Sequence, residues 1–178
     1  SQTRHNIGFM VVDALARAQG LDLSKNRFDA LYGQTRMAGK KLFLARPMSF
    51  MNRSGFPIQR LASFFKIPVE NILVVHDDMD LEFGKIKIVK SRGHGGHNGV
   101  RSIIDAFGTR GFIRIRVGVG RPAVSKAGRS SVTGHVLGGF SPDEQDLLGQ
   151  TVADAAKACI QVLEKGLTKA MNRVNSKN

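Results

Sequence analysis

The sequence has little of three things: cysteine, acidic residues and long apolar runs. Its 178 residues include a single cysteine, Cys159, so a disulfide framework and a zinc ribbon are excluded by number alone. Cys159 lies in an apolar pattern of helical period, and we expect a buried thiol in a reducing cytosol. No apolar run is long enough to cross a bilayer, and the first residues lack the order of a signal peptide. We therefore expect a soluble, cytoplasmic protein without a membrane partner.

Acidic residues are outnumbered by basic ones almost two to one. Asp and Glu total 14 against 27 Lys and Arg, which gives a formal net charge of +13. A positive field of this kind attracts polyanions and raises their encounter rate. Nucleic acid is therefore the first partner to consider, although proteins also carry such charge for solubility alone.

Helical and strand patterns alternate along the chain. Helical spacing predicts helices after His5, at Pro57, at Val100 and at Ser141, the last opened by a capping box in "SPDE". Strand patterns predict a hairpin at 30–37 and 41–46, a buried strand at 71–78, and strands at 85–90 and 112–120. This interleaving predicts an α/β layer fold with a mixed sheet. The small, polar segment 122–135 is typical of a mobile loop.

The stretch "RGHGGHNGVR" at 92–101 suits neither a helix interior nor a strand. Its glycines allow the backbone to approach a ligand closely, whereas Asn98 before an apolar helix is equally typical of a plain helix cap. The spacing matches neither a dinucleotide fingerprint nor a Walker loop. His94 and His97 have no third ligand at a spacing typical of a metal site, so we expect no metal.

The acids of "HDDMD" at 76–80 admit three interpretations: a metal site, a capped strand end, or a carboxylate that fixes the tautomer of a histidine. His5 is a candidate for that histidine. Asn52 in "FMNRSG" either caps the following helix or, together with other amides, holds a peptide group. These residues alone indicate a hydrolase or a binding protein that acts on nucleic acid.

Six segments together resemble the bacterial type of peptidyl-tRNA hydrolase, and the resemblance covers essentially the whole chain. They are "TRHNIGF", "PMSFMNRSG", "VVHDDMDLEFGKIKI", "GHGGHNGVRSII", "RIRVGVGRP" and "GLTKAMNRVN". The resemblance implies one domain over 1–178, a three-layer α/β/α fold with a mixed, mostly parallel twisted sheet. The family's chain begins with a strand and a GxxNPG turn, whereas this sequence begins beyond that turn. If that strand were absent from the protein, we would expect poor folding and loss of activity.

The resemblance also implies a role for each matching residue. His5 is similar to the family's catalytic histidine, a general base on water, and Asp77 to the acid that orients it. Asn52 and Asn98 resemble the amides that hold the peptide and the water, with Asn6 and Met51 lining the same groove. The residues implied in tRNA binding are Lys85, Lys87, Lys90, Arg92 and Arg116, of which only Arg116 matches a family position closely.

The implied reaction is hydrolysis of the ester between peptide and tRNA by a histidine-activated water, without covalent intermediate, metal or cofactor. The implied partner is the acceptor stem and 3′ end of peptidyl-tRNA, bound by a monomer. A non-catalytic RNA-binding protein on the same scaffold is the alternative, and the joint presence of His5, Asp77, Asn52 and Asn98 argues against it. A metal-dependent phosphoesterase that uses His76, Asp77, Asp78 and Asp80 is a weaker third hypothesis.

Overall fold

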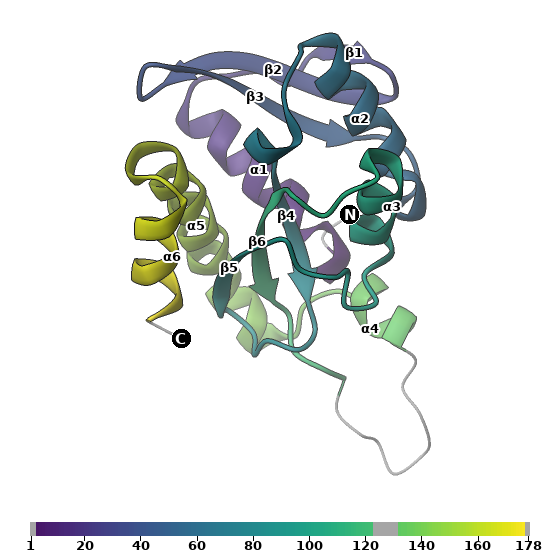
Figure 1. Ribbon diagram of the computed structural model, residues 1–178. Helices are drawn as coiled ribbons and strands as arrows, with labels where there is room; N and C mark the ends of the chain where they lie inside the picture. Colours follow the sequence, from purple (N-terminus) through teal and green to yellow (C-terminus); the bar gives the residue numbers. More distant parts are fainter. Residues whose placement is uncertain (1–2, 123–131, 177–178) are drawn as a thin grey trace. The chain divides into compact units, whose positions relative to one another are not determined.

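The structure is a computed structural model that describes residues 3–122 and 132–176 (Figure 1). Helices and strands alternate along the chain, which confirms the predicted α/β class. The helices are α1 (Ile7–Ala18), α2 (Gly55–Phe64), α3 (Asn98–Phe107), α4 (Val132–Leu137), α5 (Pro142–Lys165) and α6 (Leu167–Asn175). The strands are β1 (Lys25–Arg27), β2 (Ala30–Met37), β3 (Lys40–Pro47), β4 (Leu73–Asp78), β5 (Ile86–Lys90) and β6 (Ile113–Gly118). The short 3₁₀ turns are η1 (Arg4–Asn6), η2 (Met51–Arg53) and η3 (Val69–Asn71).

The chain forms two compact units, each assembled from segments that are distant in the sequence. The first unit comprises Ser1–Val11, Val75–Ile88 and Ile115–Asn178. The second comprises Val12–Val74 and Val89–Arg114. Because of this division, η1 and the carboxyl end of β4 belong to the same unit although most of the second unit separates them in the sequence.

One three-stranded sheet has the order β4-β6-β5. The Ile113 N–H donates to Ile72 at one end and the Val119 N–H donates to Asp78 at the other, so β4 and β6 run parallel. Gly118 exchanges backbone hydrogen bonds with the residues that lead into β5, which runs antiparallel to β6. The sheet is therefore mixed, as predicted.

A second three-stranded sheet, β1-β2-β3, is entirely antiparallel and was not predicted as a separate sheet. The β2–β3 hairpin confirms the predicted one, and its turn residues Ala38 and Gly39 both have positive φ. The third strand, β1, was missed because its three residues, "KNR", are all exposed and carry no apolar alternation. The curved ribbon of this sheet is visible in Figure 1.

Local stop and cap residues account for one end of each of two helices. Gly20, in the left-handed region, follows the last turn of α1, and the Leu21 N–H donates to Ala16 there. At α5, the Ser141 side chain accepts from the Glu144 N–H while Glu144 accepts from the Ser141 N–H, which confirms the capping box. Of the predicted loop 122–135, residues 123–131 lie outside the described residues, and α4 begins at Val132.

Apolar side chains fill the interior of each unit. In the first unit Ile7, Ile88, Ile115 and Val117 are fully buried, and in the second Phe112 packs with Val100 and Ile103. Cys159 is a free, buried thiol, as predicted, and burial raises its pKa to about 12. Among the described residues, no helix combines the length and apolarity that a bilayer crossing requires.

Candidate active site

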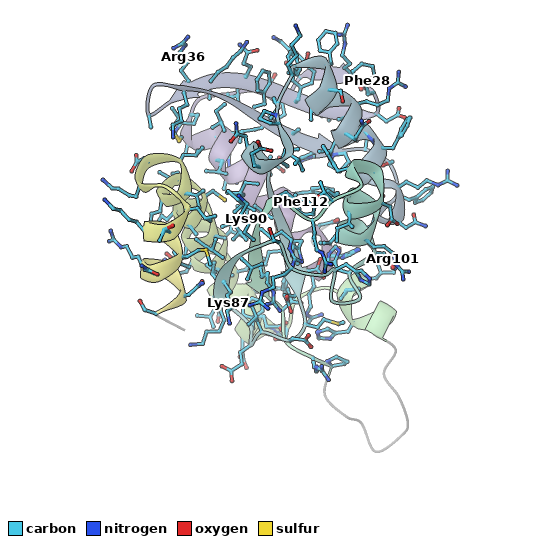
Figure 2. The ribbon with its side chains drawn as sticks, viewed as in Figure 1. Phe28, Arg36, Lys87, Lys90, Arg101 and Phe112 are labelled. Atoms are coloured by element: carbon cyan, nitrogen blue, oxygen red, sulfur yellow. The ribbon has the colours of Figure 1, made fainter. Side chains whose placement is uncertain are left out.

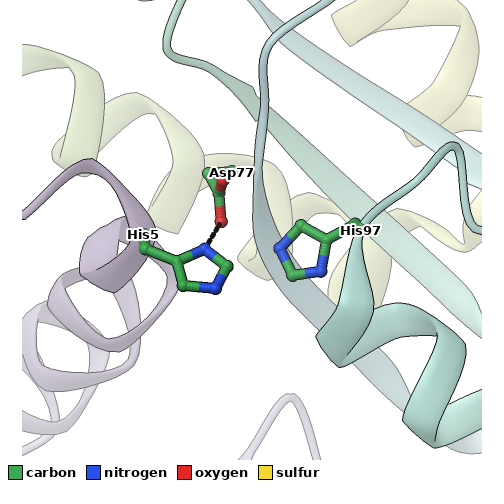
Figure 3. A group of neighbouring side chains, drawn as sticks. All are labelled: His5, Asp77 and His97. Atoms are coloured by element: carbon green, nitrogen blue, oxygen red, sulfur yellow. Dashed lines mark hydrogen bonds and ion pairs between the residues drawn. The ribbon is translucent and has the colours of Figure 1, made fainter. Parts of the chain in front are cut away.

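His5 and Asp77, 72 residues apart in the sequence, form a hydrogen-bonded pair within the first unit. The His5 Nδ1 lies 2.8 Å from the Asp77 Oδ1, as the dashed line in Figure 3 shows. The Asp77 side chain is 4% exposed and the His5 ring 17% exposed. A carboxylate at Nδ1 favours the tautomer with its proton on that nitrogen, so that Nε2 carries the lone pair. The pair predicted from the sequence is therefore brought together in the arrangement of a base and its orienting acid.

The local sequence around each partner explains why they meet. Asp77 lies near the carboxyl end of β4, and His5 lies in η1, directly before α1. Gly8 in the first turn of α1 packs against β4: a Cβ added there would lie 2.3 Å from the Val75 carbonyl oxygen. Only glycine allows so close an approach of helix to strand. Glycine at position 8 thus allows η1 to lie close to the end of β4.

Arg4 fixes the other side of η1. Its Nη2 donates to Glu144 Oε2 at 2.6 Å, its Nη1 donates to the His135 carbonyl at 3.2 Å, and its backbone N–H donates to Gly138. Burial alone would raise the pKa of Glu144, but the Ser141 backbone N–H and the Arg4 guanidinium outweigh it and hold that pKa below its ordinary value of 4.5. Glu144, which completes the capping box of α5, therefore also anchors Arg4, the residue before His5.

The neighbouring acids of β4 and the following turn are each paired with a different cation. Asp78 accepts from Arg116 Nε, and Asp80 accepts from Arg121 Nη2 at 2.7 Å. Burial alone would raise the pKa of Asp78. The hydrogen bonds from Arg116 and from the Asp80 backbone have the larger effect and hold this pKa below its ordinary value of 3.8. Carboxylates with these separate partners do not form the convergent cluster that the phosphoesterase hypothesis requires.

The predicted substrate-binding amides belong to the second unit. Asn52 is exposed in η2, and Asn98 is exposed at the first position of α3. The two elements are packed together, with the Met51 side chain against Gly99. The cap of α2 is Ser54, and that of α3 is His97, whose Nδ1 accepts from the Val100 N–H at 3.2 Å. The interpretation of Asn52 and Asn98 as helix caps is therefore wrong, and both residues are exposed.

Further hydrogen bonds stabilise the turn formed by the 92–101 stretch. His94 Nδ1 accepts from the Gly96 N–H at 3.0 Å, inside a turn in which Gly95 and Gly96 have positive φ. The Gly93 carbonyl accepts from Arg114 Nη2 at 2.9 Å. His97, also drawn in Figure 3, contributes the helix cap described above. The stretch thus builds a turn that presents Asn98 at the start of α3.

The predicted tRNA-binding residues differ in exposure. Lys87 and Lys90 are exposed on β5 (Figure 2), Arg92 is exposed beyond it, and Lys85 is half-buried. Arg116 is half-buried and forms an ion pair with Asp78. Exposed lysines on a strand can contact phosphates directly.

Sequence reasoning missed Arg4, Gly8 and Glu144 as supports of the pair. The capping box was a signal for Glu144, but it could not show a partner 140 residues away. Asn6, the other predicted groove residue, is the last residue of η1 and is half-buried.

A family model described as peptidyl-tRNA hydrolase matches residues 1–178. The chain belongs to the peptidyl-tRNA hydrolase family. A protein named peptidyl-tRNA hydrolase from Caldanaerobacter subterraneus subsp. tengcongensis is 43% identical over 97% of this chain and 91% of its own length. One from Clostridium botulinum is 40% identical over 98% of this chain and 89% of its own length. The crystal structure of peptidyl-tRNA hydrolase from Acinetobacter baumannii superposes with a TM-score of 0.86 at 37% identity, covering 98% of this chain and 87% of that one.

These similarities confirm the family resemblance inferred from the six quoted segments. His5 and Asp77 both lie within the six segments that resemble the peptidyl-tRNA hydrolase family. The fold-level similarity extends over both units, because 98% of the chain is covered.

Proposed function

We propose that the protein hydrolyses the ester bond that joins a peptide to the terminal ribose of tRNA, and so recycles tRNA from peptidyl-tRNA. The 2.8 Å contact between His5 Nδ1 and Asp77 Oδ1 carries this proposal. It is supported by family membership over residues 1–178 and by relatives named peptidyl-tRNA hydrolase.

The proposed step begins with a water molecule at His5 Nε2. Nε2 takes one proton while the water oxygen attacks the ester carbonyl carbon, and the resulting tetrahedral intermediate then loses the ribose oxygen. The protonated imidazole returns its proton to that oxygen, so the products are a free peptide carboxyl group and a tRNA hydroxyl. A positioned base of this kind contributes roughly 10²- to 10⁴-fold to the rate. The step needs no covalent intermediate, metal or cofactor.

Asp77 acts by orienting the imidazole and by stabilising its protonated form. Asn52 and Asn98 are proposed to hold the peptide backbone and the water, since an amide offers both a donor and an acceptor. Asn6 and Met51 line the same groove in this proposal. The roles of these residues are inferred from their match to the family's motifs, and the exposure of Asn52 and Asn98 is compatible with contact to a substrate.

For the tRNA, we propose phosphate contacts from Lys85, Lys87, Lys90, Arg92 and Arg116 to the acceptor stem and 3′ end. Contacts to phosphate carry no base identity, which suits an enzyme that accepts many tRNAs. The net charge of +13 supports such a partner.

The fold and setting complete the proposal. We expect one domain over 1–178, a three-layer α/β/α arrangement with a twisted, mixed sheet, as the extent of the family match and the TM-score of 0.86 support. We further expect a monomer that acts in the cytoplasm, where peptidyl-tRNA arises.

The deciding experiment measures release of tRNA from a defined N-acetyl-aminoacyl-tRNA and from the same aminoacyl-tRNA without the acetyl group. We expect hydrolysis of the acylated form, and of the unacylated form only slowly, because the proposed amide contacts require a peptide group. Tight tRNA binding without hydrolysis of either form would refute the proposal and favour the non-catalytic RNA-binding alternative.

A further inference from the structure

Two arginines alternate with three phenylalanines on the surface of the second unit. The Arg27 guanidinium lies 4.0 Å from the ring centroid of Phe64 and 5.5 Å from that of Phe28. The Arg60 guanidinium lies 4.6 Å from the centroid of Phe28 and 5.4 Å from that of Phe56. The side chains thus form a continuous series, Phe64–Arg27–Phe28–Arg60–Phe56, which we call the aromatic–arginine surface.

The outer members of this surface are open to solvent. Phe56 is 61% exposed and Phe64 is 51% exposed, and both arginines are exposed. Phe28 is half-buried and packs on the cluster of Ala30, Tyr32 and Leu61. The central residue of the surface, Phe28, therefore packs against the core, and the rings and guanidinium groups on either side of it are exposed.

The two arginines contact rings rather than carboxylates among the described residues. In the described parts of the chain, no carboxylate forms an ion pair with Arg27 or Arg60, whereas Arg46 in the same unit is paired with Asp13 at 2.7 Å. A guanidinium held over a ring loses little side-chain freedom when it binds, and its N–H edge can still reach phosphate. Both charges are therefore available to an anionic ligand.

The position of Phe28 is conformationally costly. Arg27 pairs with Ala30, so Phe28 and Asp29 form a two-residue hairpin turn, and their φ values are +54° and +58°. Such turns favour Asn-Gly, because a bulky side chain at positive φ is strained. The ring of Phe28, placed between Arg27 and Arg60, makes this strained turn part of the aromatic–arginine surface.

We propose that the aromatic–arginine surface binds unpaired nucleotides of RNA, with bases stacked on the exposed rings and guanidinium planes and phosphates on the guanidinium edges. Stacking on aromatic side chains beside cationic groups is how proteins hold single strands without reading their sequence. An aliphatic partner would offer no anion to the guanidinium groups of Arg27 and Arg60. Duplex RNA offers phosphates, but its bases are stacked on one another and cannot stack on the exposed rings. The inference rests on the proposed function only in that the protein encounters RNA.

The test measures binding of the full chain to a fluorescein-labelled oligouridylate by fluorescence anisotropy. The double variant Phe56→Leu and Phe64→Leu keeps both charges and removes two exposed rings. We expect affinity to fall about fivefold or more for each base that loses its ring. Affinity for a labelled RNA duplex of the same length should change less than twofold. Unchanged affinity for oligouridylate would overturn the proposal.

A charge-matched pair of variants tests the arginines. The double variant Arg27→Gln and Arg60→Gln should reduce the magnitude of the slope of log K against log salt for oligouridylate binding by roughly 1.4. This value corresponds to about 0.7 for each of two lost phosphate contacts on a single strand. Arg36→Gln with Arg110→Gln removes the same charge from exposed positions of the second unit. Figure 2 shows Arg36 at the other end of the β2–β3 hairpin from Phe28. An equal effect of both double variants would overturn the proposal.

Two further outcomes are decisive. Tighter binding of a labelled acidic peptide than of oligouridylate would assign the surface to a protein partner and overturn the proposal. Hydrolysis of N-acetyl-aminoacyl-tRNA by the unsubstituted protein is measured separately. If the protein hydrolyses this substrate but the Phe56→Leu and Phe64→Leu substitutions leave oligouridylate binding unchanged, only this inference is refuted. If the substitutions weaken binding but the protein does not hydrolyse the substrate, only the proposed function is refuted.

Discussion

Arginines are used in opposite ways in two regions of the molecule. Around the His5–Asp77 pair they are bound to carboxylates: Arg4 to Glu144, Arg116 to Asp78 and Arg121 to Asp80. On the aromatic–arginine surface, Arg27 and Arg60 lie over phenylalanine rings and have no acidic partner among the described residues.

The difference separates positioning from binding. A cation paired with a largely buried carboxylate, as Arg4 is with Glu144, holds two segments of chain at a fixed distance and offers little charge to a ligand. A cation supported by a ring keeps its charge for a ligand. Substitutions near His5 should therefore change geometry, catalysis and stability, whereas substitutions on the aromatic–arginine surface should change binding.

The largest effect is expected from His5→Ala. Loss of the base should lower the turnover of N-acetyl-aminoacyl-tRNA by roughly 10²- to 10⁴-fold, while affinity for tRNA stays within about twofold because phosphate contacts remain. Steady-state kinetics and a tRNA-binding assay on the same preparation measure the two quantities. A parallel loss of both would mean that His5 serves binding and would remove the contrast between the regions.

Asp77→Asn should lower turnover less than His5→Ala does. The amide and water can still orient the imidazole in part, but the negative charge that stabilises its protonated form is lost. Turnover of the two variants under identical conditions gives the order directly. A loss as large as that of His5→Ala would show that the imidazole contributes nothing to catalysis without the negative charge of Asp77.

Gly8→Ala should destabilise the fold and impair catalysis together. Its Cβ would lie 2.3 Å from a backbone oxygen of Val75, so the start of α1 must move away from β4. We expect a loss of about 3 kcal/mol in unfolding free energy, at the upper end of ordinary overpacking, measured by urea denaturation.

Gly149→Ala is the matched control for this substitution. Gly149 is exposed within α5, and an added Cβ there meets no atom within 4 Å. Alanine in a helix interior should raise stability by up to about 1 kcal/mol. Equal effects of the two substitutions would show that the contact at Gly8 does not set the position of η1.

The smallest predicted effect comes from comparing one chemical change in the two regions. Arg4→Gln should lower the unfolding free energy by about 2 kcal/mol, less than for a fully buried pair, because Arg4 and Glu144 are 11% and 19% exposed. Arg60→Gln should lower it by less than about 1 kcal/mol. Urea denaturation at neutral pH measures both.

The cost of Arg4→Gln should depend on pH. The folded-state pKa of Glu144 is depressed, so its contribution to stability is present above pH 4.5 and is lost as pH falls through the lower folded-state pKa. The difference between Arg4→Gln and the unsubstituted protein should therefore shrink below pH 4.5. A constant difference across this range would show that the ion pair with Glu144 is not the source of the stability.

Features encoded in short stretches of sequence were predictable. Alternating residues predicted the β2–β3 hairpin and "SPDE" predicted the start of α5, whereas the His5–Asp77 pair was implied by the resemblance to the family's motifs. Each of these depends on periodicity, a cap or a motif that lies within a few neighbouring residues.

Features that depend on the packing of distant segments were not predictable. The Arg4–Glu144 contact joins residues 140 positions apart, and the requirement for glycine at position 8 exists only once α1 packs on β4. Likewise, β1 has no apolar pattern, and the choice of His97 over Asn98 as helix cap depends on the turn that precedes it. The aromatic–arginine surface combines β1 with α2, which no sequence period relates.

Imidazole added to the His5→Ala variant tests most directly whether the ring of His5 is the base. The rate at which this variant releases tRNA from N-acetyl-aminoacyl-tRNA should be very low and should rise in proportion to the imidazole concentration, with no such rise for the unsubstituted protein. Release by His5→Ala at nearly the unsubstituted rate, without imidazole, would contradict the account.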